Sequence, residues 1–513
     1  MARAACLAPG EPIPYHLLML TINLDKGDLD IALQAEDAVK RLVELGLLRE
    51  EEGDAVRLHR LVIAFVRDVL ADEVNSAQEM VEMAIGEESK YINEAGYPAP
   101  LLPWQPHLRA VTNVALMRED QQAARLCNEL GWHLWQIGDY AGGQPYFEQA
   151  LAIRQRILGE EHPDTAHSFN SLGYLLRSQG KLAEAGPYLK RALIIREKVL
   201  GETHPKMAES LNDMGRWYFE QGDLVTAKPY YERALAISRK VLGEEHPLTA
   251  EYFNNLGLCL QELGDLTGAQ PHLERALAIR EEVLGERHPD TGGSLNNMGY
   301  LLRDLGKLSE AQLYHEWALA LRQTVLGPEH PDTAQSLSNL GAVLQDQGDF
   351  ERAKAYLERA LAIREKVLGK EHPSTAICLA HLGRLLQAQG DLEGAQQYLE
   401  QALAIRQKVL RPDYPLTAVS LNNLGIVLLA RGDLAQAQSY LEQALTIRQK
   451  VFGKDHLFTA QSLKTLGEVL KAQGDLSGAR SFYERALAIF EVQLGPDDAE
   501  TKIAREKLAI LDT

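Results

Sequence analysis

The sequence predicts an all-α fold in which pairs of helices stack into a solenoid, behind a small N-terminal domain that does not share the repeat. A 42-residue spacing recurs through about three-quarters of the chain, and each repeat has the apolar periodicity of two amphipathic helices. At 513 residues the chain is also too long for one compact core unless its architecture is repetitive.

Charge and composition exclude several classes of protein. The formal net charge is −19, whereas a protein that binds nucleic acid or an anionic membrane needs a basic surface. The four cysteines are scattered without a C-x-x-C motif, which indicates neither a disulfide framework nor a zinc site. No apolar run reaches the ~18 residues of a membrane span, and Pro9, Pro12 and Pro14 break the stretch that resembles a signal peptide. We therefore expect a cytoplasmic protein with no membrane and no nucleic-acid partner.

The first 75 residues have a pattern of their own. EDAVKRLVELGLL predicts a helix that ends at Gly46, two short extended runs follow around a turn at Glu51–Asp54, and HRLVIAFVRDVL predicts another helix. Helix, helix, hairpin and helix in this order indicate a small winged-helix domain over residues 1–75. A helical linker is expected over 76–121.

Nine copies of the 42-residue unit follow over residues 122–500. Three residue types keep the same register through the copies, apart from two joints where Tyr414 and Asp498 replace histidine. Histidine recurs at His162, His204, His246, His288, His330, His372 and His456. Glycine recurs at Gly131, Gly173, Gly215, Gly257, Gly299, Gly341, Gly383, Gly425 and Gly467, and alanine at Ala150, Ala192, Ala234, Ala276, Ala318, Ala360, Ala402, Ala444 and Ala486.

Each unit is expected to form two helices, A and B. In AHSFNSLGYLLRSQG the apolar residues follow helical spacing, and Gly180 ends helix A because glycine adopts the left-handed conformation at little cost. An aspartate such as Asp223 then caps helix B, and the proline after each joint histidine begins the next helix A. Gly173 and Ala192 are small because two helices approach closely there. No single pair buries its apolar face alone, so the copies must stack.

The repeat resembles the tetratricopeptide repeat, whose L-G…A…A pattern is matched in all nine copies. The 42-residue length and the motif L-N-N-L-G…A-L-A-I-R-E-K-V-L-G-x-x-H-P are similar to those of the repeat variant in kinesin light chains and their bacterial relatives. The resemblance implies a right-handed superhelical solenoid. It departs at RPDYP, KDHLF and PDDAE, where a less regular joint is expected. Residues 501–513 are expected to form a C-terminal capping helix.

The N-terminal phrases CLAPGEPIPYHLL, LVELGLL and VRLHRLVIAFVRDVL resemble the winged-helix region that follows the nucleotide-binding core in STAND NTPases of the NB-ARC type. The NTPase core itself is absent, because no G-x-x-x-x-G-K-[ST] motif occurs. We therefore expect no nucleotide binding or hydrolysis by this chain. Either it is the C-terminal part of a larger ATPase or it is a stand-alone adaptor.

A groove for a protein or peptide partner is expected on helices A, which the resemblance places on the concave side. Asparagine recurs three residues before the glycine, and its amide suits a peptide backbone, although it would equally well stiffen the stack by bonding to the next repeat. Positions just after the glycine and one turn further vary from copy to copy, as on a recognition surface, and the alternative is a solvated face. The candidate residues are Asn128, Trp132, Trp135, Asn170, Tyr174, Arg177, Asn212, Arg216, Phe219, Asn254, Asn296, Tyr300, Arg303, Gln345, Arg384 and Asn422.

Other repeated residues have a structural interpretation. Each copy contributes one joint histidine, and stacked copies lie roughly 15–20 Å apart, so neighbouring histidines cannot share a metal. The helix-B arginines, such as Arg154 and Arg280, are expected to pair with acidic neighbours or to cover apolar surface. With no nucleophile–base pair, metal cluster or phosphate loop, we expect no enzyme, no catalytic residues and no cofactor.

The function predicted from the sequence is a protein- or peptide-binding scaffold, the sensor arm of a STAND-type signalling ATPase. Self-association and an upstream NTPase domain are further possible partners. The alternative is a winged-helix DNA-binding regulator with a tetratricopeptide effector domain. Residues 1–75 hold 8 Lys/Arg against 14 Asp/Glu, a balance of −6, which disfavours DNA.

Overall fold

The computed structural model describes residues 1–22, 29–52, 54–94, 99–409, 415–496 and 498–512. The chain divides into two compact units. Unit 1 holds Met1–Ser178 with Pro187–Gly201, and unit 2 holds Gln179–Gly186 with Glu202–Thr513. The joint at Tyr414 lies outside the described residues.

The N-terminal part of unit 1 mixes short helices with a small sheet. Its helices and strands are α1 (Ala2–Ala5), β1 (Ile13–Pro14), α2 (Tyr15–Ile22), α3 (Leu29–Glu44), β2 (Leu48–Glu51), β3 (Ala55–Leu58), α4 (Arg60–Val69), α5 (Ala71–Glu94), η1 (Ala99–Trp104) and α6 (Gln105–Ala115). The predicted hairpin is confirmed, since β2 and β3 pair antiparallel with Arg49 opposite Arg57. Strand β1 was not predicted; it pairs with β3 and gives the order β1-β3-β2. The winged-helix assignment stays a prediction.

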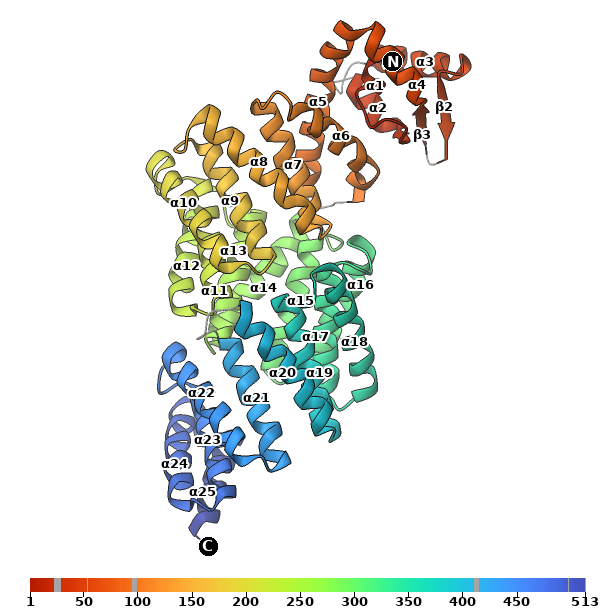
Figure 1. Ribbon diagram of the computed structural model, residues 1–513. Coiled ribbons are helices and arrows are strands. Elements are labelled where there is room, and N and C mark those ends of the chain that lie inside the picture. Colours follow the sequence, from red (N-terminus) through yellow and green to blue (C-terminus); the bar gives the residue numbers. More distant parts are fainter. Residues whose placement is uncertain (23–28, 53, 95–98, 410–414, 497, 513) are drawn as a thin grey trace. The chain divides into compact units, whose positions relative to one another are not determined.

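Helix pairs form the rest of the chain, and Figure 1 shows them side by side in chain order within each unit. Helices A are α7 (Gln121–Gln136), α9 (Pro163–Ser178), α11 (Pro205–Glu220), α13 (Pro247–Glu262), α15 (Pro289–Asp304), α17 (Pro331–Asp346), α19 (Pro373–Gln389), α21 (Pro415–Arg431) and α23 (Leu457–Gln473). Helices B are α8 (Tyr140–Leu158), α10 (Leu182–Leu200), α12 (Leu224–Val241), α14 (Leu266–Val283), α16 (Leu308–Val325), α18 (Phe350–Val367), α20 (Leu392–Val409), α22 (Leu434–Phe452) and α24 (Leu476–Gln493). The all-α solenoid of paired helices is confirmed.

The joints between copies are hydrogen-bond networks. The Nδ1 atom of each joint histidine accepts the backbone N–H two residues later, as His246 does from Leu248 at 3.2 Å, and so caps the next helix A. Proline follows at the first helical position, where its missing N–H costs nothing, except after His456, which Leu457 follows. Thr249 Oγ1 donates to the carbonyl of Gly243 at 2.7 Å and closes the loop. The repeated histidine is therefore a helix cap.

The cap fixes the protonation state of the ring. Nδ1 accepts only in the neutral tautomer that carries its proton on Nε2. At His456, Nε2 lies 3.2 Å from the carbonyl oxygen of Leu263, so the joint also touches the end of α13 from an earlier copy within unit 2. Burial lowers the pKa of His456 and favours this neutral form.

Helix B begins as predicted. Asp265 Oδ1 accepts the N–H of Gly268 at 2.8 Å, and aspartates in most other copies cap helix B in the same way. The preceding Gly264 has φ +86°, and its N–H donates to the carbonyl of Gln261 at 2.9 Å. Glycine is used there because the left-handed conformation strains other residues.

Close packing of helices A and B explains the glycine of each helix A. A Cβ atom built on Gly257 would lie 2.7 Å from Leu273 Cγ, and one on Gly173 would lie 2.7 Å from Leu189 Cδ2. Real carbon contacts are not this short, so a larger residue would force the two helices apart.

Several helix-B arginines bond to main-chain carbonyl and hydroxyl groups, partners that the sequence did not predict. Arg322 and Arg364 are almost fully buried, and Nη1 of Arg322 donates to the carbonyl of Asp332 at 2.9 Å and to Ser336 Oγ at 3.0 Å. Arg280 and Arg448 bond in the same manner. The buried guanidinium satisfies main-chain carbonyl groups at the start of the next helix A, and its role is to join the copies.

The C-terminal end carries α25 (Ala499–Ala509), which continues in the short 3-10 helix η2 (Ile510–Asp512). Ala504 packs with Ala486 and Phe490 of α24, so the predicted capping helix covers the last copy. Asp498 takes the place of the joint histidine and accepts the N–H of Glu500 at 2.8 Å.

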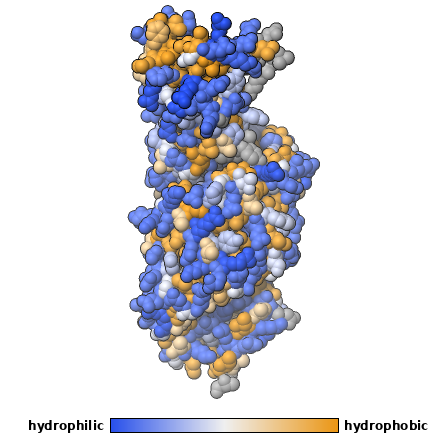
Figure 2. All heavy atoms as spheres, turned by 90° about the vertical axis from the view of Figure 1, so that its right-hand side faces the viewer, coloured by the Kyte–Doolittle hydropathy of each residue, from blue (hydrophilic) through white to orange (hydrophobic). Residues whose placement is uncertain are grey.

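The face shown in Figure 2 is mostly hydrophilic, with hydrophobic side chains spread in small patches along the repeats. Hydrophobic side chains are more extensive over the N-terminal elements, where Leu61, Phe65 and Val69 of α4 are more than half exposed. Among the described helices none has the length and apolar character needed to cross a bilayer.

Candidate ligand groove

Helices A lie on the inner side of each unit. Within each unit successive helices A pack on one another, as α7 does on α9 and α13 on α15. A helix B packs between the helix A of its own copy and that of the next, as α8 does between α7 and α9 and α14 between α13 and α15. The closer approach of helices A places them on the concave side of the stack. Positions that face away from helix B are therefore exposed to this inner side.

Copies one and two bring four aromatic residues together on this side of unit 1. The ring of Tyr174 lies 5.3 Å from that of Trp132 and 5.1 Å from that of Trp135, centroid to centroid. Tyr140, at the start of α8, stacks on Trp135 at 6.4 Å. These rings are only partly buried, so part of each face is available to a ligand.

Arg177 completes this aromatic cluster. Its Cζ atom lies 4.6 Å from the centroid of Tyr174, within cation–π distance, and its side chain is buried. The prediction that Trp132, Trp135, Tyr174 and Arg177 form one surface fits this geometry. Whether they contact a ligand stays a prediction.

The repeated asparagines are buried, and most bond within the stack. Ser171 Oγ donates to Asn128 Oδ1 at 3.3 Å, and Asn255 Nδ2 donates to Asn212 Oδ1 at 2.8 Å. Asn297 donates to Asn254 and Ser462 donates to Asn422, again between neighbouring copies. Asn296 bonds with His315 of its own copy. Asn170 is buried as well. This arrangement favours the alternative that the asparagines stiffen the stack.

A donor–acceptor step recurs across successive helices A. A side chain four residues after the glycine bonds to the residue five after the glycine of the next copy, 43 positions later. The pairs are Trp135 Nε1 to Ser178 Oγ at 2.9 Å, Gln261 Nε2 to Asp304 Oδ2 at 2.7 Å, and Arg303 Nε to Asp346 Oδ2 at 2.6 Å. This step links neighbouring copies along the inner surface.

Charged groups alternate on the inner surface of unit 2. Arg384 Nη2 lies 3.6 Å from Asp346 Oδ1, and Arg216 Nη1 lies 3.5 Å from Glu251 Oε1. The hydroxyl of Tyr300 donates to Glu262 Oε1 at 2.8 Å. Burial raises the pKa of Glu262, and the charge of Glu262 in turn raises the pKa of Tyr300. This part of the inner surface therefore carries both signs of charge.

This surface also has acidic members that were not predicted. Glu262, Asp304 and Asp346 occupy the fifth position after the glycine in consecutive copies, and their 42-residue spacing is visible in the sequence. The predicted groove residues lie at three other positions of helix A, three residues before the glycine and one and four residues after it. Two predicted groove residues, Phe219 and Gln345, are half-buried on the same helices A.

Among the described residues, no group of three or more His, Cys, Asp and Glu could hold a metal ion. The four cysteines are buried, and burial raises the pKa of Cys127 and of Cys259 to about 12, so neither thiol ionises near neutral pH.

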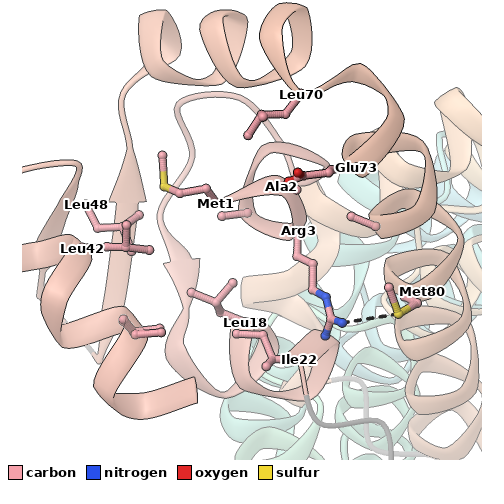
Figure 3. Close-up of a pocket in the computed structure, with 14 residues that line it drawn as sticks. Met1, Ala2, Arg3, Leu18, Ile22, Leu42, Leu48, Leu70, Glu73 and Met80 are labelled. Atoms are coloured by element: carbon pink, nitrogen blue, oxygen red, sulfur yellow. Dashed lines mark hydrogen bonds between the residues drawn. The ribbon is translucent and has the colours of Figure 1, made fainter. Parts of the chain in front are cut away.

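A separate apolar cavity of about 400 Å³ lies among α1, α2, α3 and α5 in unit 1. Figure 3 shows Met1, Leu18 and Leu42 around this space, with Arg3 at its edge. Arg3 Nη2 donates to Met80 Sδ at 3.3 Å. None of the predicted groove residues lines this cavity.

Comparison with known proteins supports the repeat assignment. The tetratricopeptide repeat family model matches overlapping segments over residues 121–193, 169–240, 218–282, 252–324, 318–366, 332–408, 382–450 and 416–491. No curated protein matches the sequence.

Several solved structures are similar to this chain. BtubC (BKLC) from P. vanneervenii is 27% identical, covering 46% of this chain and 92% of its own, with a TM-score of 0.35. The repeats of a putative kinesin light chain from Podosopora anserina are 31% identical over 40% of this chain and 99% of their own, with a TM-score of 0.32. A STAND protein with a tetratricopeptide repeat sensor from Pyrococcus horikoshii is 15% identical over 100% of this chain and 65% of its own, with a TM-score of 0.41.

Proposed function

The chain belongs to the tetratricopeptide repeat family, a scaffold suited to protein binding, and we propose that it binds a protein or peptide along the inner side of helices A. The observation that carries this proposal is the cluster of Trp132, Trp135, Tyr174 and Arg177. Aromatic residues and arginine are the residue types that most often dominate binding energy at interfaces.

The inner side of helices A has different chemistry in the two units. In unit 1 the partly exposed rings offer apolar contact to a ligand side chain. In unit 2 the inner surface offers paired charges, such as Arg216 with Glu251, whose partners a ligand would have to replace or extend. The buried asparagines hold the copies in register beneath both parts.

Selection of peptides displayed on phage against the full chain tests the proposal. Selected peptides should bind the variants Tyr174→Ala and Arg216→Ala at least about tenfold more weakly, a loss of about 1.4 kcal/mol. The matched control is Glu184→Ala, an exposed change on helix B of the same copy as Tyr174, which should leave the dissociation constant unchanged. Equal affinity for all three variants would refute the groove.

We further propose that the repeats are the sensor arm of a STAND-type signalling ATPase. The N-terminal phrases quoted above and the order α2, α3, hairpin, α4 support this role. Ligand capture would shift the equilibrium between two states of the larger protein. Sequencing of the reading frame upstream of Met1 tests it: a G-x-x-x-x-G-K-[ST] motif is expected, and a stop codon in its place would contradict the proposal.

A further inference from the structure

Copy five departs from the other copies on its outer side. Leu313 and Trp317 lie one turn apart on α16 and are 50% and 55% exposed. Tyr314 contacts the Trp317 ring edge-on, with centroids 5.4 Å apart. At the position equivalent to Trp317 every other copy has glutamine or arginine. These residues are Gln149, Arg191, Arg233, Arg275, Arg359, Gln401, Gln443 and Arg485. Trp317 therefore replaces a polar residue at an exposed position.

The neighbouring joint departs as well. Arg287 occupies the position before the joint histidine, where the other joints in described residues carry Glu119, Glu161, Thr203, Glu245, Glu329, Glu371 and Asp455. In four of these joints the acidic residue pairs with a base 37 residues later, as Glu329 does with Lys366 at 2.9 Å and Glu371 with Lys408 at 2.6 Å. Copy five has Thr324 in place of that base, so both charges of the pair are changed.

The two departures lie on the same side of the copy. In copy four, Arg275 at the register of Trp317 forms an ion pair with Glu245 at the register of Arg287. The same register places Trp317 beside Arg287. Within the described parts of the chain Arg287 has no ion-pair partner, and it is exposed. Copy five thus presents an exposed indole and an unpaired guanidinium where the other copies carry polar or charged residues, and the exposed Leu313 lies beside the indole.

We propose that Leu313, Trp317 and Arg287 form an outer docking surface for an acidic amphipathic helix. Leu313 and Trp317 are spaced by one helical turn, which matches two apolar side chains of a partner helix at i and i+4. Arg287 supplies the charge that a flanking carboxylate of that partner would pair with, and arginine binds a carboxylate through two parallel N–H donors. This surface is distinct from the inner groove and does not depend on it.

A designed peptide tests this surface with the full chain. The probe is a fluorescein-labelled alanine-based helix of about 18 residues, five turns, with leucines along one face and glutamates beside them. Its binding is measured by fluorescence anisotropy. The variants Trp317→Arg and Arg287→Glu introduce residues that other copies already carry at these positions, so both are expected to fold, which circular dichroism and thermal unfolding check. The matched control is Arg359→Gln, at the register of Trp317 in copy six.

Wild type and Arg359→Gln should bind the peptide equally. Trp317→Arg should weaken binding at least about tenfold, and Arg287→Glu should weaken it about threefold and reduce its dependence on salt. A version of the peptide with lysine in place of glutamate should bind at least about tenfold more weakly. Absence of binding to wild type, equal binding by Trp317→Arg, or equal binding of the lysine peptide would overturn the proposal. A wild-type dimer in light scattering that Trp317→Arg converts to monomer would instead assign the surface to a second copy.

Discussion

The indole ring of Trp135 lies 5.1 Å from the ring of Tyr174 in the next copy, edge-on at 71°, and its Nε1 donates to Ser178 Oγ at 2.9 Å. This contact joins two copies at the place where the groove is most aromatic. We therefore expect the pair to contribute both to the stability of the stack and to ligand recognition.

The first role predicts a measurable coupling. Trp135→Ala and Tyr174→Ala should each destabilise the chain, and the double variant should lose about 1 kcal/mol less than the sum of the two, because an aromatic pair contributes about that amount. Urea unfolding of the four proteins gives the coupling energy. Additivity within about 0.3 kcal/mol would show that the rings do not interact.

Two glycines of helices A should respond in opposite ways to the same change. Gly257→Ala places a Cβ 2.7 Å from Leu273 and should destabilise the chain by about 1–3 kcal/mol. Gly293→Ala has no neighbour closer than 3.7 Å and should stabilise α15 by up to about 1 kcal/mol through helix propensity. Hydrogen exchange should show faster opening in copy four for the first variant. Equal effects would contradict the close approach.

The joint histidines predict that the stability of the chain depends on a side-chain hydrogen-bond acceptor before each helix A. His246→Ala removes the cap on α13 and should cost about 1 kcal/mol, whereas His246→Asn restores a side-chain acceptor and should recover most of the loss. Chemical denaturation measured at pH 8 compares the three proteins. If alanine and asparagine are equally destabilising, the ring contributes through packing and the cap is unimportant.

The buried ring of His315 predicts that the unfolding free energy depends on pH. The ring is fully buried, its Nδ1 lies 2.9 Å from Asn296 Oδ1, and burial lowers its pKa to about 3, with Arg303 and Arg322 adding to the shift. In the unfolded chain a histidine has a pKa near 6.5. The contribution of the neutral His315 ring to the unfolding free energy is therefore complete above that pH and is lost as the pH falls toward 3. At pH 5 the loss should be about 2 kcal/mol.

The variant His315→Gln keeps a donor for Asn296 but does not titrate. The difference in unfolding free energy between pH 7.5 and pH 5 should be smaller in this variant than in wild type by about that amount. An identical pH profile for the two proteins would show that His315 has the same pKa in the folded and the unfolded chain, and would contradict the lowered pKa.

Much of the fold could be predicted from the sequence, because the residues that indicate each helix start and helix end recur in nine copies. Pro163 and Pro205 begin helices, Asp265 caps helix B, and Gly257 lies against Leu273, as the spacing indicated. The errors occurred where a residue has no local signal. Strand β1 is two residues long and depends on pairing with β3, and the partners of Arg322 are a carbonyl and a hydroxyl in the next copy.

The site could be predicted only in part. Helical periodicity identifies Trp132, Trp135 and Tyr174 as inner residues, but it does not separate an exposed position from a buried one. Asn212 and Asn254 therefore entered the candidate set although both are buried and bond to the next copy. Trp317 and Arg287 were not predicted, because the constant registers of helix B and of the joints have a structural interpretation and only the variable positions of helix A indicated a recognition surface.

Site-specific photocrosslinking of a display-selected peptide is the most direct measurement of where the partner binds. A benzophenone amino acid at Leu258, which follows the glycine of α13 on the inner side, should crosslink the peptide, and the same amino acid at Glu274 on the outer side of α14 should not. Strong crosslinking from Glu274, together with none from Leu258, would contradict the assignment of the groove to helices A.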